Sequence, residues 1–204
     1  ASLIGTIPGP PAPGGTTRQS IPRTLYPSPW VRPADWLVMP TVTDAEQKIV
    51  GLYPVFDHNS NFVALTCSDN YTVDWGDGTI ENFNSGIKAE HTFIYSTCSN
   101  LSAQGYKQTL VTITPNGGNL TTVTLNYAHT KSSNAYNAWL DIVGAGQYIT
   151  SIALANLKYL EQFSFGLNAI TNFSSMFNSC QSLQTIPLLD THLATNFTSM
   201  FNGC

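Results

Sequence analysis

The sequence predicts a mainly β protein with three successive parts: an extended N-terminal arm, an antiparallel β-sandwich and a short stack of repeated coils. Three observations support this. Residues 1–36 hold eight of the twelve prolines, residues 37–130 contain short apolar or alternating runs separated by turn residues, and the end of the chain repeats with a period of 24 residues. Short strands with frequent turns are typical of sandwiches, and a fixed period of this size is typical of stacked coils.

Composition and charge narrow the classes of function. Charged residues make up 10% of the 204 positions and the formal net charge is -4, whereas soluble domains usually carry about 25% charged residues. A polar but weakly charged surface suits an extracellular or particle-bound protein. The acidic balance argues against nucleic-acid binding, and no apolar run reaches the roughly 20 residues of a membrane-spanning helix. The first residues also lack the basic and apolar regions of a signal peptide.

The predicted arm covers residues 1–36. Its prolines remove backbone donors, which opposes both helix and central strand. The stretch "RTLYPSPWVRPADW" also interleaves large apolar side chains and arginine with proline. The candidate docking residues are Leu25, Tyr26, Trp30, Arg32 and Trp36. We predict that they anchor in another protein, because buried anchors offset the entropy lost when an arm becomes ordered. Two alternatives stay open: a leader that packs on its own domain, and arginines that contact nucleic acid.

The second part, residues 37–130, is predicted to form the strands of a sandwich. The predicted strands are "DWLVMPTV" (35–42), "KIVGLYPVF" (48–56), "NFVALTC" (61–67), "YTVDW" (71–75), "QTLVTITP" (108–115) and "TTVTLNYA" (121–128). The residues "NGGN" at 116–119 predict a tight hairpin between the last two runs, since glycine adopts positive φ without steric cost. Asp57 and His58 are an adjacent acid and base, and we interpret them as part of a turn.

A specific motif lies inside this part. "YTVDWGDGTIENF", followed by "EHTF" at 90–93, resembles the signature of PKD-type β-sandwich domains, which place a GDG turn after a strand that ends in an aromatic residue. The matching positions are Val73, Trp75, Gly76, Asp77, Gly78, Thr79, His91 and Phe93. The resemblance implies a PKD-like or Ig-like sandwich.

We predict that Asp74, Trp75, Gly76, Asp77 and Gly78 build a structural turn. The glycines permit it, Asp77 bonds its N–H groups and Trp75 fills the core. The alternatives are a calcium site or a hydrolytic carboxylate pair on the two aspartates.

Residues 131–147 are predicted to connect the second and third parts. Ala135, Trp139, Leu140 and Val143 recur at helical spacing, which favours a short helix.

The third part covers residues 148–204. "NFSSMFNSC" at 172–180 returns as "NFTSMFNGC" at 196–204. The motif "NFSSMFNSCQSLQTIPLLDT" resembles the BspA-type leucine-rich repeat, and residues 148–171 would form a degenerate first coil. Each coil would add one strand and turn the same side chains inward. The predicted repeat core is Phe173, Met176, Phe177, Cys180, Leu183, Ile186, Phe197, Met200, Phe201 and Cys204. Because the repeat stops within a coil, we expect that the natural protein continues or that a partner covers this end.

Function is predicted to be structural and non-enzymatic, with no catalytic residue, metal or cofactor, because no phosphate loop, zinc spacing or nucleophile motif occurs. The stretch from "VRPADWLVMP" to "YTVDWGDGT" is also similar to virion proteins of aquatic tailed bacteriophages. That resemblance implies a virion location as a tail, fibre or capsid-decorating protein. Its arm would bind other virion proteins, and a homo-oligomer would face a host-surface glycan or protein. A bacterial cell-surface BspA-like adhesin is the alternative, and an accessory module of a carbohydrate-active enzyme a weaker one.

Overall fold

The computed structural model describes residues 30–132 and 137–204, and it is mainly β, with two mixed sheets. The mainly β prediction is therefore confirmed. Residues Arg32–Cys204 form one compact unit. Within the described ranges the helical content is a three-residue 3-10 turn, η2 (Tyr95–Thr97). None of the helical structure in those ranges is long and apolar enough to cross a membrane.

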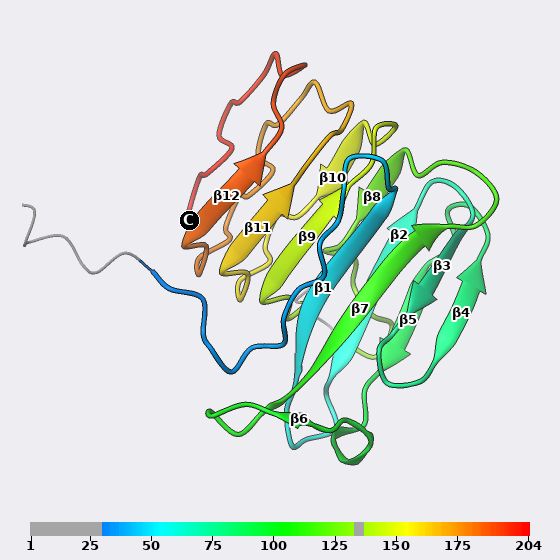
Figure 1. The fold of residues 1–204 in the computed structure, drawn as a ribbon, viewed down its shortest axis with the longest axis vertical. Helices are drawn as coiled ribbons and strands as arrows, with labels where there is room; N and C mark the ends of the chain where they lie inside the picture. The colour runs from blue at the N-terminus through cyan, green and yellow to red at the C-terminus, as the bar shows by residue number, and fades with distance from the viewer. Residues whose placement is uncertain (1–29, 133–136) are drawn as a thin grey trace, which may run out of the picture. The chain divides into compact units, whose positions relative to one another are not determined.

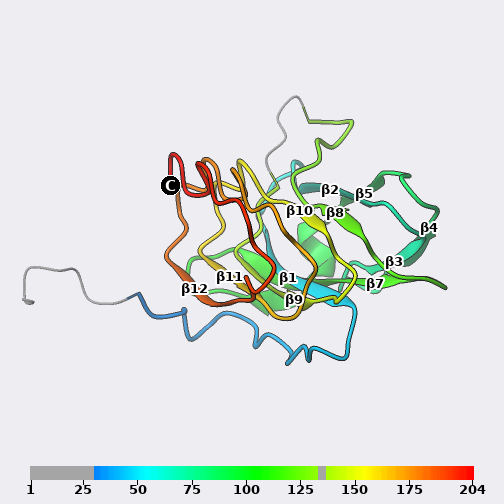
Figure 2. The same ribbon diagram turned by 90° about the horizontal axis from the view of Figure 1, so that it is seen from above.

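The two sheets pack face to face in a sandwich-like arrangement (Figures 1 and 2). The larger sheet has the order β12 (Thr185–Leu189), β11 (Gln162–Phe165), β9 (Asp141–Ala145), β1 (Lys48–Val55), β7 (Lys107–Pro115), β3 (Tyr71–Asp74) and β4 (Ile80–Phe83), and β6 (Asn100–Leu101) pairs with β7. The smaller sheet has the order β10 (Ser151–Ala153), β8 (Thr122–Thr124), β2 (Phe62–Cys67) and β5 (Ala89–Thr92).

Each sheet changes from antiparallel to parallel pairing at one strand. β9 pairs antiparallel with β1 and parallel with β11. β8 pairs antiparallel with β2 and parallel with β10. The regions 37–130 and 148–204 therefore share both sheets, and strand pairing is continuous across the connector between them.

The two copies of the sequence repeat lie beside each other in register. Four backbone N–H groups of the first copy donate to carbonyl groups of the second, at N···O distances of 2.8–3.0 Å. The pairs are Phe173 with Asn196, Ser175 with Thr198, Phe177 with Met200, and Ser179 with Asn202. This ladder explains the 24-residue period, because equivalent residues must meet at equivalent places in adjacent turns.

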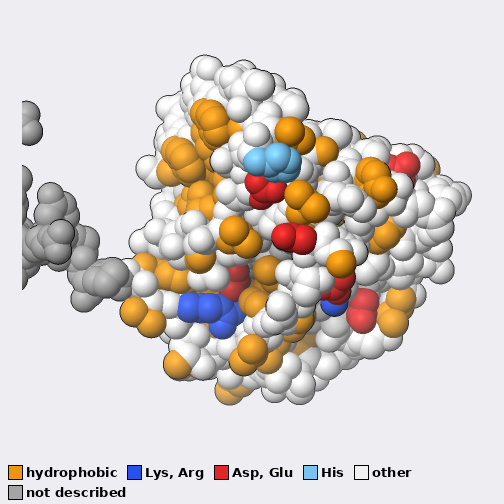
Figure 3. All heavy atoms as spheres, turned by 45° about the horizontal axis from the view of Figure 1, so that its top comes forward, with side chains coloured by type: hydrophobic (Ala, Val, Ile, Leu, Met, Phe, Trp, Pro, Cys, Tyr) orange, Lys and Arg blue, Asp and Glu red, His pale blue; other side chains and the backbone are white. Residues whose placement is uncertain are grey.

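One hydrophobic core runs between the sheets and into the repeated turns. It contains Trp75 and Trp139 from the antiparallel half, and Phe163, Phe165 and Phe177 from the parallel half, all fully buried. Outside this core, charged side chains are sparse and the hydrophobic ones form small separate patches on the face in Figure 3.

Residues 32–47 cross the outer face of the larger sheet. Leu37 N–H donates to Gln108 Oε1 (2.9 Å), and Gln108 Nε2 donates to the carbonyl of Asp35 (2.8 Å). Asp44 Oδ1 accepts a hydrogen bond from Leu167 N–H (2.8 Å). The strand predicted at 35–42 is not formed. Its apolar residues lie over the sheet instead of beside an edge strand, and Pro40 lacks the N–H that a ladder requires.

Two further local predictions differ from the structure. Residues 116–119 do not close a hairpin, because β7 belongs to the larger sheet and β8 to the smaller one, so this turn links the layers. Asp141–Ala145 form the strand β9 in place of the predicted helix. Ile142 and Val143 are β-branched, and ladders to β1 and β11 satisfy the backbone on both sides, which outweighs the helical spacing of the apolar residues. Ala135 lies outside the described residues.

Candidate functional site

The β1–β2 loop (residues 56–61) is held in shape by one buried amide. Asn61 is 3% exposed. Its Oδ1 accepts from Phe56 N–H (2.8 Å), and its Nδ2 donates to the carbonyls of Phe56 and His58 (both 2.9 Å). His58 Nδ1 accepts from Ser60 N–H at 3.0 Å. The loop therefore presents its outer side chains from a fixed backbone.

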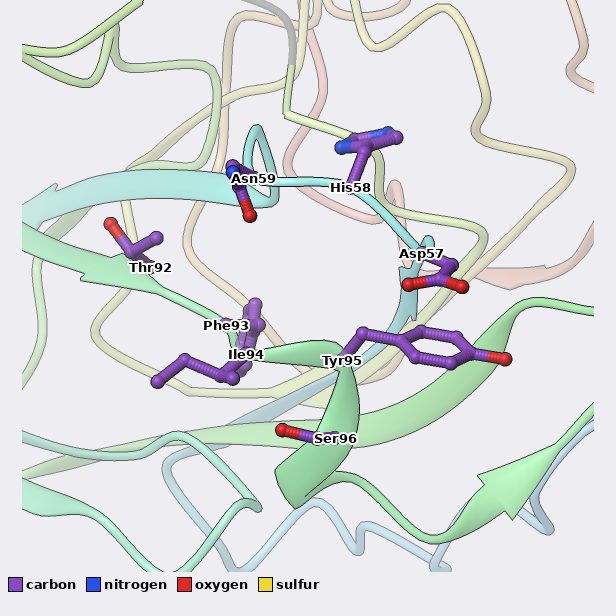
Figure 4. Close-up of a pocket in the computed structure, with 8 residues that line it drawn as sticks. All are labelled: Asp57, His58, Asn59, Thr92, Phe93, Ile94, Tyr95 and Ser96. Carbon is purple, nitrogen blue, oxygen red and sulfur yellow. The ribbon is translucent and has the colours of Figure 1, made fainter.

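The larger cavity beside this loop has a volume of about 300 Å³, at the lower end of the roughly 300–1,000 Å³ typical of small-molecule sites. It is lined by Asp57, His58, Asn59, Thr92, Phe93, Ile94, Tyr95 and Ser96. In Figure 4, Asp57 and Asn59 reach from the loop toward residues 92–96, whereas His58 points away from the centre.

Four polar side chains around this cavity are available to bind a ligand. Within the described ranges, the side chains of Asp57, Asn59, Thr92 and Ser96 have no hydrogen-bond or ion-pair partner in the protein. A carboxylate, an amide and two hydroxyls therefore face one cavity with their bonding capacity intact. Such a set can bind a small polyhydroxylated molecule, since each side chain can replace a water molecule that solvates the ligand.

Tyr95 supplies an ordered aromatic wall. Its hydroxyl donates to the carbonyl of Gly105 (3.1 Å). Lys107 Nζ donates to the carbonyl of Tyr95 (2.9 Å) and lies 4.5 Å from the ring centroid. These contacts fix the position of the Tyr95 ring, and they engage the Lys107 ammonium group within the protein.

A second cavity of about 170 Å³ lies on the other side of the same loop and also includes His58. It is lined by Tyr53, Pro54, Phe56, His58, Ser60, Asn61, Phe62, Ala138 and Tyr159. Phe56 and His58 stack at 5.7 Å with an interplanar angle of 13°. Tyr159 is 53% exposed. Together the two cavities combine open aromatic surface with polar groups at one end of the sheets.

The sequence-predicted turn is held by hydrogen bonds within the protein. Asp74 Oδ1 accepts from Gly76 N–H (2.9 Å), and Asp77 Oδ1 accepts from Thr79 N–H (3.0 Å). Trp75 is fully buried, and its Nε1 donates to Glu81 Oε2 (2.7 Å). Asp74 and Asp77, the two carboxylates that metal binding or hydrolysis would require, therefore hold the turn instead.

Asp77 also pairs with His91. Asp77 Oδ2 lies 2.7 Å from His91 Nε2. Partial burial acts to raise the pKa of Asp77, but the hydrogen bonds from His91 and Thr79 outweigh it and lower the pKa below 3.8. Burial, with the charge of Asp77, raises the pKa of the Cys98 thiol. A thiol that stays protonated is a poor nucleophile, so these three residues do not resemble an activated cysteine site.

The predicted arm residues divide between the body and the preceding chain. Arg32 Nε donates to Asp141 Oδ2 (2.7 Å), and Trp36 is 4% exposed, with its Nε1 donating to the Tyr106 hydroxyl (2.8 Å). These two side chains are used within this chain, as in the alternative of a leader that packs on its own domain. Trp30 is partly exposed and precedes the compact unit. Leu25 and Tyr26 lie outside the described residues.

The residues of the predicted repeat core divide into a buried group and an exposed group. Phe173, Met176, Phe177, Cys180 and Met200 are buried, and Leu183 and Ile186 are partly buried against the core. Phe197 and Phe201 are 49% and 51% exposed, and Cys204 is exposed. The outer rings still match the inner ones: Phe197 stacks on Phe173 at 5.6 Å and Phe201 on Phe177 at 5.5 Å. The second copy thus repeats the geometry of the first at the edge of the stack.

No three His, Cys, Asp or Glu side chains are grouped as ligands of one metal ion among residues 30–132 and 137–204. Comparison with known proteins gives no relative: the chain matches no protein-family model, no curated protein and no solved structure. The β1–β2 loop is therefore identified as the candidate site from its geometry. Sequence reasoning treated Asp57 and His58 as a turn. The available signal was the polar run "DHNSN" between two strands, flanked by phenylalanines.

Proposed function

We propose that the protein is a non-enzymatic structural component of a tailed-bacteriophage virion, of the tail, fibre or capsid-decorating kind. In this proposal a PKD-like sandwich, continued by BspA-type leucine-rich-repeat coils, is displayed on an N-terminal arm that docks on other virion proteins. The observation that carries the proposal is the attachment of residues 32–36 to the middle of the larger sheet.

That attachment is an ion pair between the partly exposed Arg32 and a buried carboxylate. Asp141 lies on β9, between β1 and β11, and its side chain is 1% exposed. Arg32 is its one ionic partner in the described ranges, and the same guanidinium donates to the carbonyls of Leu37 (2.6 Å) and Trp36 (3.4 Å). Separating a buried pair leaves an uncompensated charge and costs about 3–5 kcal/mol. A load on the preceding chain would therefore meet resistance at the centre of the body, as an anchored display protein needs.

Docking in this proposal rests on residues before Arg32. Arg32 and Trp36 bind the body of their own chain, so they are not available to a partner without unseating that segment. The docking candidates that precede Arg32 in the sequence are Leu25, Tyr26 and Trp30.

Host attachment is proposed for the displayed part. The described surface is polar and weakly charged, so contacts with a host glycan or protein would depend on hydrogen bonding and shape. Single contacts of that kind are weak. A homo-oligomer on a particle would compensate by multivalent binding.

A bacterial cell-surface adhesin is the second candidate. The in-register ladder between residues 172–180 and 196–204 favours it, because stacked coils also suit an extended adhesive surface. In that case the same body would be attached to a cell envelope.

Two truncations test the proposal. A chain of residues 31–204 lacks Leu25, Tyr26 and Trp30 but keeps Arg32 and Trp36, so it should unfold at nearly the same temperature as the full chain and yet be missing from purified particles. A chain of residues 37–204 loses both side chains and should be clearly less stable. Mass spectrometry of particles and of host envelopes then decides between the candidates. Normal incorporation of the 31–204 chain would contradict the docking role, and recovery of the full chain only in envelopes would favour the adhesin.

A further inference from the structure

We propose that the β1–β2 loop binds a neutral saccharide, with sugar units in the two cavities on either side of His58. The virion proposal supplies a source for this ligand, a glycan of the host surface. The saccharide site itself rests on the geometry of the loop.

The chemistry of the cavities fits a sugar ring. Such a ring presents C–H groups on its faces and hydroxyl groups around its rim, so its binding site needs aromatic or aliphatic surface beside planar polar side chains. The larger cavity offers the Tyr95 ring and Ile94 beside Asp57 and Asn59. A carboxylate accepts from two adjacent hydroxyls, and an amide both donates and accepts. Because these groups have no partner in the described protein, ligand binding breaks no internal hydrogen bond.

The second cavity extends the site. Tyr159 and Phe56 are 53% and 38% exposed, and both line it together with His58 and Ser60. Since His58 borders both cavities, a ligand that fills both must span the loop. The expected ligand is therefore an oligosaccharide of at least two units, not a single sugar.

Charge selects against anionic sugars. Asp57 faces the larger cavity with no cation paired to it in the described ranges, and a second carboxylate there would be repelled. Lys107 lies behind Tyr95 with its ammonium group already bonded to the Tyr95 carbonyl. Uronic and sialic acids should consequently bind less well than neutral hexoses.

The loop and the aromatic wall are already held in place before a ligand binds, which favours binding even in a small cavity. Asn61 fixes the loop through three hydrogen bonds, and Tyr95 is fixed by Gly105 and Lys107. Little conformational entropy is then lost when a ligand binds, which reduces the free-energy cost of association.

The test uses the full chain and a panel of neutral and anionic oligosaccharides on an array, followed by NMR titration with the best binder. Neutral oligosaccharides should bind and should shift the amide signals of residues 56–61 and 92–96. Asn59→Ala and Asp57→Ala should each weaken binding roughly tenfold, because each removes a hydrogen bond to the ligand. Tyr159→Ala should weaken binding of a disaccharide more than that of a monosaccharide.

Tyr148→Ala is the matched control. Tyr148 is 46% exposed, close to the value for Tyr159, but it lines neither cavity. Its variant should bind normally, and all variants should unfold at the temperature of the unmodified chain, because the substituted groups are exposed.

Four results would overturn the site: no saccharide bound, binding insensitive to Asp57 and Asn59, a preference for anionic sugars, or a peptide bound at the loop instead. Particle incorporation is measured separately. A chain that is incorporated but binds no saccharide refutes this site alone, whereas a chain that binds saccharide but is missing from particles refutes the virion role alone.

Discussion

Gly76 and Gly78 share a positive φ, +75° and +98°, but differ in their surroundings. A Cβ on Gly76 would overlap the carbonyl oxygen of Leu110 and the Thr109 hydroxyl, whereas a Cβ on Gly78 would meet open space. Thr109 Oγ1 donates to the Trp75 carbonyl (2.9 Å), so the crowding is part of how the turn is held on β7. The two glycines of one motif therefore serve different needs.

Alanine at these two positions should give unequal losses. Gly78→Ala should cost about 1–2 kcal/mol, the strain of positive φ in a residue with a Cβ. Gly76→Ala adds a clash with backbone that has no room to move, and should cost at least about 2 kcal/mol more. Urea unfolding of the two variants measures the difference, and equal losses would show that the crowding is relieved.

Acid stability should depend in part on Glu90. Partial burial acts to raise the pKa of Glu90, but hydrogen bonds from Lys88 and Thr130 outweigh it and lower the pKa from 4.5 to about 2. A lowered folded-state pKa stabilises the protein above pH 4.5, and this contribution is lost as the pH falls from 4.5 toward 2. Glu90→Gln should therefore flatten the decline of the melting temperature over this range. Parallel curves for the variant and the unmodified chain would exclude this contribution.

At the scale of single elements, β9 carries an unusual residue. Asp141 lies in the interior of a sheet, and burial raises its pKa above 3.8 although the hydrogen bond and charge of Arg32 oppose the change. Its Oδ1 is buried without a hydrogen-bond partner. The carboxylate is thus poorly solvated and depends on Arg32.

Arg32→Met should destabilise the protein by about 3–5 kcal/mol, since Asp141 would remain buried without its cation. The double variant Arg32→Met, Asp141→Asn removes the charge as well and should recover at least half of the loss. Urea unfolding of both variants measures the coupling. A double variant no more stable than the single one would mean that Arg32 acts through packing on Trp36.

The repeated turns offer a matched pair of phenylalanines. Phe177 is fully buried, stacked on Phe201 and edge-on to Phe163 at 5.2 Å. Phe177→Ala should cost about 3–5 kcal/mol because it leaves a cavity, and Phe201→Ala, half-exposed at the edge, should cost less than about 2 kcal/mol. Thermal or urea unfolding of the two variants tests this. A similar loss at both positions would indicate that the edge ring is covered in solution.

Elements whose residues pair within the sheets were predictable from local pattern. The runs at 48–56, 61–67 and 71–75 each contain a strand, because a short run of apolar residues, continuous or alternating, indicates burial directly. The run at 35–42 is equally apolar but covers a sheet face, and pattern alone does not distinguish covering a sheet from joining it. At 141–145 the helical spacing was misleading because pairing with β1 and β11, both distant in sequence, determines the outcome.

At the scale of the whole molecule, the candidate site could not be predicted in the same way. Its side chains come from the β1–β2 loop, from residues 92–96 and from Tyr159, and only the packing of both sheets brings these segments together. The WGDGT turn is different. The hydrogen bonds from Gly76 N–H to Asp74 and from Thr79 N–H to Asp77 lie within six consecutive residues, so these roles could be predicted from the local sequence.

The molecule as a whole should be insensitive to chelation. Asp74 and Asp77 accept backbone N–H groups, and Asp77 also pairs with His91, so the turn has its carboxylates engaged without a cation. Adding a chelator should leave the melting temperature unchanged. A drop that calcium reverses would show that the carboxylates bind metal in preference to the turn.

The change from antiparallel to parallel pairing at β8 and β9 has a consequence for how such a molecule can evolve. Beyond these strands the chain continues in successive turns stacked in one direction, and each added turn lengthens the stack by a strand spacing of about 4.8 Å. Duplication of a 24-residue unit would then lengthen the body in small equal steps without rearranging the antiparallel half. The length of this stack is a quantity that gene duplication can adjust, while the loop at residues 56–61 and the ion pair between Arg32 and Asp141 stay unchanged.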